Sequence, residues 1–201
     1  NLSVSFGLLG KPKSEFIEFI VMESGNLAGI TITNVGDKQN PHYQFPTAEV
    51  SAGETVVYHW RSVEEGIRDE LTVKTISGGT QACSAARDFW GPHTSLPKRN
   101  ANVILIKTGS DGDIQDAVLY CTEKEFVKRS AAPAWNDEEL VREAELAVAS
   151  GVWRGEAVLK DAVIAPITAS KSLVRSTKTG VNKADSWTLR NWKDVTMGKP
   201  Y

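Results

Sequence analysis

The sequence of 201 residues lacks the features of a membrane-spanning chain and of several well-known catalytic classes. No apolar run approaches the roughly 20 residues that a membrane-spanning helix requires. There is no Gly-x-Ser-x-Gly motif and no glycine-rich phosphate loop that ends in lysine, so neither a hydrolase nucleophile turn nor a nucleotide site is predicted. We therefore expect no cofactor and no transmembrane segment.

Histidine and cysteine are scarce, which limits metal and thiol chemistry. The three histidines, His42, His59 and His93, have none of the short spacings of local zinc sites, so we expect no metal. The two cysteines, Cys83 and Cys121, lack C-x-x-C spacing. They permit one disulfide if the chain is exported, and would be buried small hydrophobes if it is cytosolic.

The composition is that of an ordinary globular protein, with 41% hydrophobic and 24% charged residues. We expect a single domain over residues 1–201. Residues 171–201 carry seven Lys/Arg and two acidic residues, but no interleaved aromatic platform, so no nucleic acid partner is expected. Because the numbering begins at Asn1 rather than Met, we expect a fragment or a mature form from which an export signal or lipid anchor has been removed.

The dominant hydrophobic period is two, which is typical of β-strands. In the strand predicted over residues 15–21, Ile17, Phe19 and Val21 fall on one face. Asp111-Gly112 between two apolar runs predicts a hairpin. The predicted strands cover residues 15–21, 27–33, 55–60, 71–76, 102–107, 114–120, 172–175 and 187–190. Many short strands separated by polar turns favour an all-β sandwich.

One segment has helical periodicity instead. Residues 136–151 place Leu140, Ala144, Ala147 and Val148 on one face, and Gly151 supplies a left-handed stop. Asn136 at the start of this segment is predicted to cap the first turn. Residues 122–169 are therefore predicted to be a helical insertion in the sandwich.

Five short segments carry a resemblance to one family. They are residues 15–19 (Glu-Phe-Ile-Glu-Phe), 27–33 (Leu-x-Gly and a strand), 45–58 (Phe-Pro and a valine strand), 103–120 (a Gly turn between strands) and 172–200 (Ser-Leu-x-Arg to Thr-x-Gly-x-Pro). In this order they resemble the lamin-tail domain, an immunoglobulin-like β-sandwich also found in exported bacterial proteins. The sequence departs from the pattern at Ile30, where an aromatic residue is usual, and in the size of the insertion.

The resemblance implies a function for the chain. A lamin-tail-like domain implies a non-catalytic recognition or adhesion module of an extracytoplasmic protein, at the cell surface, in the periplasm or secreted. It would bind a protein or glycan partner through the insertion and the loops. Among the six tryptophans, Trp90, Trp135 and Trp153 lie outside the predicted strands, so they are candidate ligand-binding residues, although they could equally pin the insertion to the sandwich.

Two alternatives remain open from the residues themselves. The first is a hydrolase whose site is assembled from His59 or His93 and loop carboxylates such as Asp88. In that case Cys83 could be imagined as a nucleophile beside a histidine. The second alternative is a purely structural spacer domain with no ligand of its own.

Overall fold

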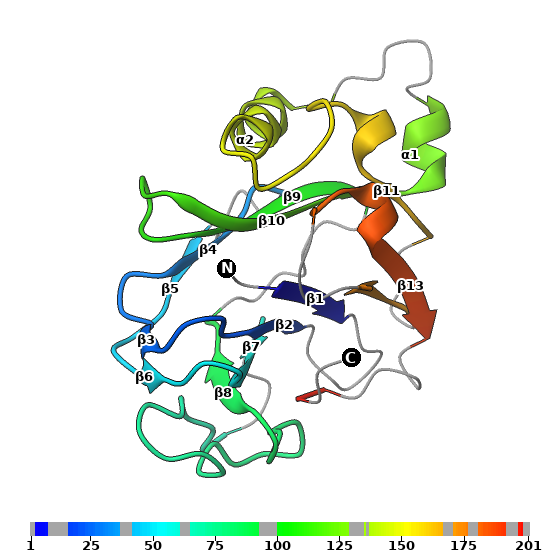
Figure 1. The fold of residues 1–201 in the computed structure, drawn as a ribbon. Coiled ribbons are helices and arrows are strands. Elements are labelled where there is room, and N and C mark those ends of the chain that lie inside the picture. Colours follow the sequence, from blue (N-terminus) through cyan, green and yellow to red (C-terminus); the bar gives the residue numbers. More distant parts are fainter. Residues whose placement is uncertain are drawn as a thin grey trace.

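The computed structural model describes residues 3–7, 16–36, 42–60, 65–92, 100–128, 135, 137–166, 171–176, 181–191, 197 and 198. Most of the regular structure in these residues is β, arranged in two facing sheets (Figure 1). The first sheet has the order β13 (Trp187–Asn191), β12 (Lys171–Arg175), β1 (Ser3–Gly7), β2 (Phe16–Ile20), β7 (Thr55–His59) and β8 (Arg87–Trp90). The second has the order β11 (Val163–Ile164), β10 (Ile114–Cys121), β9 (Ala101–Lys107), β4 (Thr31–Asn34) and β5 (His42–Gln44).

The remaining elements are short strands and helices. Two-residue strands β3 (Gly25–Asn26) and β6 (Glu49–Val50) pair with each other. The helices are α1 (Glu123–Lys128) and α2 (Glu138–Ala149), and single 3-10 turns lie at Leu159–Asp161 and Ala184–Ser186. The predicted fold class, a mainly β sandwich with a helical insertion, is confirmed. No helix in the described part of the chain is long and apolar enough to cross a membrane.

The alternation predicted for β2 is confirmed. Ile17, Phe19 and Val21 are buried in the main core between the sheets. Phe16 points to the opposite face of the same strand, where it packs in a second cluster with Val57. Because neighbouring residues in a strand point to opposite faces, the burial of both sets means that the first sheet is covered on each side here.

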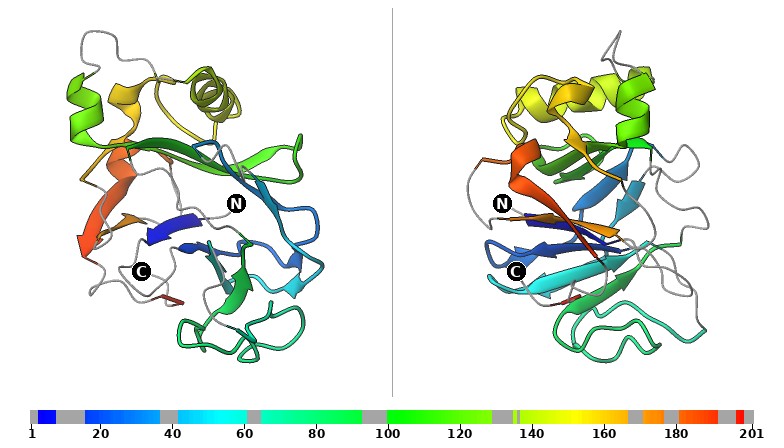
Figure 2. Two further views of the ribbon diagram at one scale, coloured as in Figure 1. Left: turned by 180° about the vertical axis from the view of Figure 1, so that it is seen from behind. Right: turned by 90° about the vertical axis from the view of Figure 1, so that its right-hand side faces the viewer.

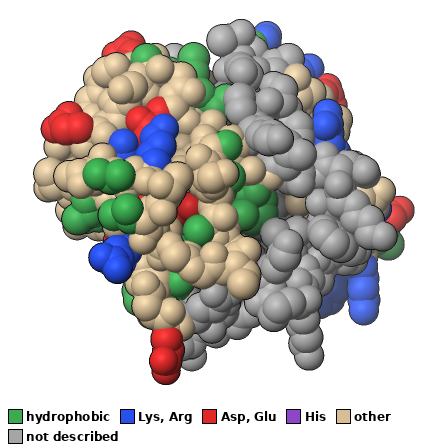
Figure 3. Space-filling view, turned by 90° about the horizontal axis from the view of Figure 1, so that it is seen from below, with side chains coloured by type: hydrophobic (Ala, Val, Ile, Leu, Met, Phe, Trp, Pro, Cys, Tyr) green, Lys and Arg blue, Asp and Glu red, His purple; other side chains and the backbone are tan. Residues whose placement is uncertain are grey.

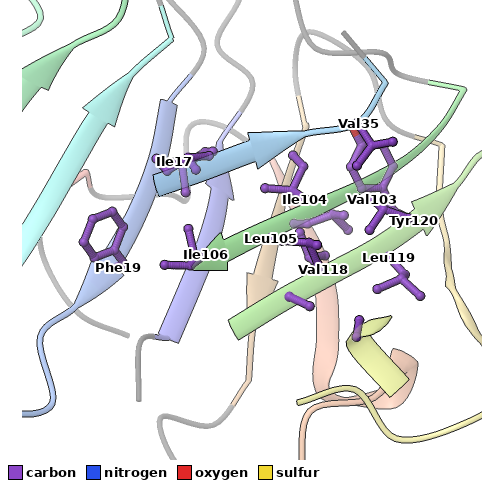
Figure 4. Close-up of a cluster of buried hydrophobic side chains, with 14 of the residues drawn as sticks. Ile17, Phe19, Val35, Val103, Ile104, Leu105, Ile106, Val118, Leu119 and Tyr120 are labelled. Atoms are coloured by element: carbon purple, nitrogen blue, oxygen red, sulfur yellow. The ribbon is translucent and has the colours of Figure 1, made fainter. Parts of the chain in front are cut away.

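The second sheet is also covered on both faces. All seven residues of β9 are buried, which explains its continuous apolar run Val103–Ile106. Figure 4 shows side chains of β2, β9 and β10 gathered in the interior. On the far side of this sheet α2 lies over β9 and β10, so the helices form a third layer outside the sandwich (Figure 2).

The insertion helix begins and ends close to its predicted bounds. Leu140, Ala144 and Ala147 are buried against the sheet, as predicted, and Gly151 follows the helix with φ +76°. The capping residue is Asp137, whose side chain accepts a hydrogen bond from the Glu139 N–H. The cap predicted at Asn136 lies outside the described residues.

The strand predicted over residues 71–76 is wrong, because this segment forms turns. Thr75 has φ +70°, which an extended strand does not allow. The N–H groups of Ile76 and Ser77 bond to the carboxylate of Glu70 and not to a neighbouring strand. The chain then crosses over and adds β8 parallel to β7, a pairing that the alternation does not predict.

Candidate functional site

The connection between β7 and β8 is the longest irregular segment in the described part of the chain. Residues 65–86 contain no helix or strand. Irregular loops longer than about 12–15 residues are uncommon in compact domains and usually serve binding or catalysis. We call residues 65–86 the β7–β8 loop and treat it, with the residues beneath it, as the candidate site.

A single buried carboxylate organises this loop. Glu70 is fully buried, and its Oε1 accepts the N–H groups of Ile76 at 3.0 Å and Ser77 at 3.1 Å. Its Oε2 accepts the N–H of Asp88 in β8 at 3.0 Å. With three backbone donors bound to one side chain, Glu70 holds the turn closed and ties it to the sheet edge.

Arg87 fixes the same loop from the other side. Its guanidinium donates to the carbonyl oxygens of Glu70 at 3.0 Å and Leu71 at 3.1 Å. Its Nε donates to Oε1 of Glu54 at 2.7 Å, and Lys74 lies 3.2 Å from the same carboxylate. Burial raises the pKa of Glu54, but these donors and the N–H of Ser51 outweigh it and lower the pKa overall.

The braced loop presents apolar side chains to solvent. Leu71, Val73 and Ile76 are 41%, 57% and 41% exposed, and we call these three residues the loop face. Figure 3 views the molecule from below and shows hydrophobic side chains exposed on the side where this loop lies. Scattered exposed aliphatic residues are ordinary, but three within six residues of one rigidly held turn form a candidate contact surface.

His59 and Asp88 meet beneath the loop. Nε2 of His59 lies 2.7 Å from Oδ1 of Asp88, and both side chains are about 1% exposed. The ring of Trp90 stacks on the imidazole at 3.8 Å and 9°. Nδ1 of His59 has no hydrogen-bond partner among the described residues. The structure thus brings together two residues that the sequence proposed for a hydrolase.

This pair has the geometry of a base and its orienting carboxylate, but both side chains are buried in the structure. A triad needs a nucleophile beside the free ring nitrogen and a path for the substrate. His59 is 0% exposed. The second oxygen of Asp88 accepts the N–H of Cys83 at 2.6 Å, so it binds backbone. His93, the other candidate histidine, lies outside the described residues.

Neither cysteine is an activated thiol. The Cys83 thiol donates to the carbonyl oxygen of Met197 at 3.1 Å. Burial and the nearby charges of Asp88 and Glu18 raise its pKa, whereas a reactive thiolate needs a lowered one. Burial likewise raises the pKa of Cys121 to about 11.

The possible disulfide is not formed in this structure. Both cysteines are free. Cys121 lies at the end of β10 in the main core, whereas Cys83 packs against the cluster on the outer face of the first sheet. The two thiols therefore belong to different layers of the sandwich.

The candidate tryptophans separate into two groups. Trp135 and Trp153 are 4% and 1% exposed, and their ring N–H groups donate to the carbonyl oxygens of Ala157 and Asp161 inside the insertion. This burial favours the other interpretation of both residues, in which they pin the insertion, over their prediction as ligand-binding residues. Trp90 is half-buried, and its indole N–H donates to Ser77 Oγ.

Sequence reasoning did not single out Glu70 or Arg87. A lone glutamate before a Leu-Thr-Val run is an ordinary strand residue by pattern, and only Gly78-Gly79 signals a turn nearby. No group of three or more His, Cys, Asp or Glu gathers as metal ligands in the part of the chain that the structure describes.

Comparison with known proteins places the chain in a family. Residues 4–189 match a family described as a protein second domain. The chain is 42% identical over 203 residues to a protein of Treponema pallidum (strain Nichols) described as uncharacterized, covering 96% of this chain. It spans 50% of the length of that relative. The chain therefore belongs to this second-domain family.

Proposed function

We propose that this chain is a non-catalytic recognition module of an extracytoplasmic protein, and that it binds a protein partner through the loop face. The observation that carries the proposal is the combination of exposed Leu71, Val73 and Ile76 with a loop held by the buried Glu70. A preorganised loop loses little conformational entropy on binding, so its apolar contacts contribute more fully to affinity.

The chemistry of the loop face favours a protein over a glycan. Sugar rings stack on exposed aromatic side chains, but the loop face is aliphatic. Of the three candidate sugar platforms, Trp135 and Trp153 are buried, and Trp90 is half-buried with its ring stacked on His59. Exposed apolar side chains interspersed with the exposed Thr72 and Thr75 along the loop suit a protein contact, in which apolar and polar groups alternate. The extracytoplasmic location rests on the lamin-tail resemblance and remains part of the proposal.

A matched pair of substitutions tests the loop face. We would introduce a photo-cross-linker at Thr72, expose the chain to a bacterial envelope extract, and identify cross-linked proteins by mass spectrometry. Val73→Asp should abolish the specific cross-link, because it charges the centre of the loop face. Val127→Asp should not, since Val127 is 61% exposed on α1, outside the loop.

The identified protein, once purified, decides the proposal. The proposal is supported if the purified protein binds the wild-type chain and the Val127→Asp variant but does not bind the Val73→Asp variant. If every cross-linked protein binds the two variants equally, the loop face is not the contact, and the structural-spacer alternative is favoured.

A hydrolase is the second candidate, because Nε2 of His59 and Oδ1 of Asp88 lie 2.7 Å apart. The purified chain would be screened with esterase, phosphatase and nuclease substrates. Activity that is lost in His59→Gln while the circular dichroism spectrum is unchanged would favour the hydrolase over the recognition module. An inactive wild-type chain would exclude it for those substrates.

A further inference from the structure

The four charged side chains of residues 68–77 are sorted by sign between the inside and the outside of the loop. The carboxylate of Glu70 is buried and binds three backbone N–H groups. The carboxylate of Asp69, which is half-buried, accepts a backbone N–H of β8 at 2.8 Å. Arg68 is exposed, and the side chain of Lys74 is 41% exposed. The charge that this turn presents to solvent is therefore mainly positive.

Both cations lie next to the loop face. Lys74 stands between Val73 and Ile76 in the sequence. Arg68 is tied to the residue after Ile76, because its N–H donates to the carbonyl oxygen of Ser77 at 3.1 Å and its own carbonyl oxygen accepts the Ser77 hydroxyl at 2.8 Å. Figure 3 shows basic side chains beside hydrophobic ones on the side of the molecule where this loop lies. A protein that covers the loop face thus meets positive charge next to apolar side chains.

Lys74 can turn toward a bound protein at little cost to the loop. Its Nζ lies 3.2 Å from Oε1 of Glu54. When Lys74 leaves, the same carboxylate keeps the Arg87 Nε at 2.7 Å and the Ser51 N–H at 2.9 Å. Ion pairs that reach solvent contribute little to stability, so the fold of the loop does not depend on this one.

We infer that the loop face binds an acidic protein segment, in which Asp or Glu flanks the apolar side chains that pack on Leu71, Val73 and Ile76. This inference rests on the proposed function and adds the chemistry of the partner. Complementary charge across an interface speeds association and disfavours partners of like charge. A basic segment with the same apolar side chains should therefore bind this loop more weakly.

The test uses the purified envelope protein that cross-links through Thr72 and loses binding to Val73→Asp. Mass spectrometry of the cross-link locates the segment that contacts the loop, in which Asp and Glu should outnumber Lys and Arg. In an Arg68→Gln/Lys74→Gln variant, the loss of two exposed ion pairs should raise Kd at least about fivefold at low salt, mainly through slower association. In about 1 M salt, where the Debye length is about 3 Å, this difference should largely disappear.

Two single variants serve as controls. Lys160→Gln also removes the charge of an exposed lysine that pairs with a glutamate, since Nζ of Lys160 lies 2.9 Å from Oε2 of Glu156 in the insertion. It should leave Kd unchanged, which would show that the total charge of the chain is not the cause. Lys74→Arg keeps the positive charge and should bind as the wild-type chain does.

Two further measurements separate lost binding from lost folding. Both side chains replaced in Arg68→Gln/Lys74→Gln reach solvent, so urea unfolding of this variant should match that of the wild-type chain. Replacing Asp and Glu by Asn and Gln in the cross-linked segment should weaken binding by a similar factor, and it leaves this chain unaltered.

The outcomes distinguish this inference from the proposed function. If no purified protein depends on Val73, the proposed function fails and the acidic partner fails with it. If a protein depends on Val73 but binds Arg68→Gln/Lys74→Gln as tightly as the wild-type chain, the loop face is a contact and the acidic partner is refuted. A salt-sensitive loss of binding in that double variant, absent in Lys160→Gln, supports the acidic partner.

Discussion

Glu70 and Asp88 hold each other through two hydrogen bonds of equal length. The N–H of Glu70 donates to the carbonyl oxygen of Asp88 at 3.0 Å, and the N–H of Asp88 donates to the carboxylate of Glu70 at 3.0 Å. Asp88 in turn bonds to His59. This contact joins the edge of the first sheet to the loop that presents Leu71, Val73 and Ile76. The two bonds therefore restrict movement of the loop face relative to the sheet.

Loss of the Glu70 carboxylate should release the loop. Glu70→Ala leaves the N–H groups of Ile76, Ser77 and Asp88 without their acceptor, and each buried unpaired group costs about 1–3 kcal/mol. We expect the free energy of unfolding in urea to fall by about 3 kcal/mol or more. Glu65→Ala, an exposed position in the same loop, should change it by less than about 0.5 kcal/mol. A Glu70→Ala variant as stable as the control would refute the role given to this carboxylate.

Trp153 should be among the most sensitive positions of the insertion. Trp153→Ala removes a ring that is 1% exposed and should lower the free energy of unfolding by about 3–5 kcal/mol. Trp153→Phe keeps most of the packing but leaves the Asp161 carbonyl oxygen without its donor, so a smaller loss is expected. Leu146→Ala on the exposed side of α2 is the control. Thermal unfolding of the three variants measures the order, and a loss for Leu146→Ala that matched Trp153→Ala would contradict it.

Of the two ion pairs that Glu143 forms, the buried one with Lys107 should contribute more to stability than the exposed one with Arg142. Nζ of Lys107 in β9 lies 2.9 Å from Oε2 of Glu143 in α2, and both side chains are under a tenth exposed. Glu143→Ala leaves the Lys107 ammonium buried and unpaired, which typically costs about 3–5 kcal/mol. Arg142→Ala removes the other partner of Glu143, but Arg142 is 64% exposed, so a change below about 1 kcal/mol is expected. Chemical denaturation distinguishes the two, and equal effects would show that the pair is not the main contact.

Stability should depend on pH through Glu18. Burial raises the pKa of Glu18 to about 7 from 4.5, against the lowering effect of the Gly198 N–H. The charge of Glu18 acts on the nearby Cys83 thiol, and the charges of Glu18 and Asp88 both raise the pKa of that thiol. A raised acid pKa means that the folded state holds a proton that the unfolded state has lost. The stabilising contribution is therefore complete below about pH 4.5 and is lost as the pH rises to about 7.

Glu18→Gln isolates this contribution, because glutamine does not ionise. Relative to Glu18→Gln, the wild-type free energy of unfolding should fall by up to about 3 kcal/mol between pH 4.5 and pH 7, at about 1.4 kcal/mol per unit of pKa shift. Urea unfolding at several pH values measures the difference between the two proteins. A difference that rises with pH, or stays constant, would refute the assignment.

The local sequence pattern was sufficient to predict the buried faces of β2 and α2. The alternation of Ile17, Phe19 and Val21 predicted the buried face of β2, and the 3.6-residue spacing of Leu140, Ala144 and Ala147 predicted the buried face of α2. The pattern failed at residues 71–76. There the alternation of Leu71 and Val73 resembles a strand, but the backbone donors are taken by Glu70, and alternation carries no information about that competition.

The candidate site could be predicted only in its parts. His59 and Asp88 were named from their chemistry, but they are 29 residues apart, and the parallel addition of β8 to β7 brings them to 2.7 Å. Trp135 and Trp153 flanked the predicted helix of the insertion, and nothing in their neighbours distinguished a ligand platform from an anchor. The burial of both rings against their own insertion made that distinction.

By itself the sequence determined which residues of β2 and α2 turn toward the main core, because the geometry of an isolated element fixes that period. The tertiary structure decided which elements pair and that the apolar side chains of the loop face stay exposed. It also decided that Gly198 and Met197 meet Glu18 and Cys83. These choices depend on contacts between residues far apart in the chain, where burial and the satisfaction of backbone hydrogen bonds outweigh local propensity.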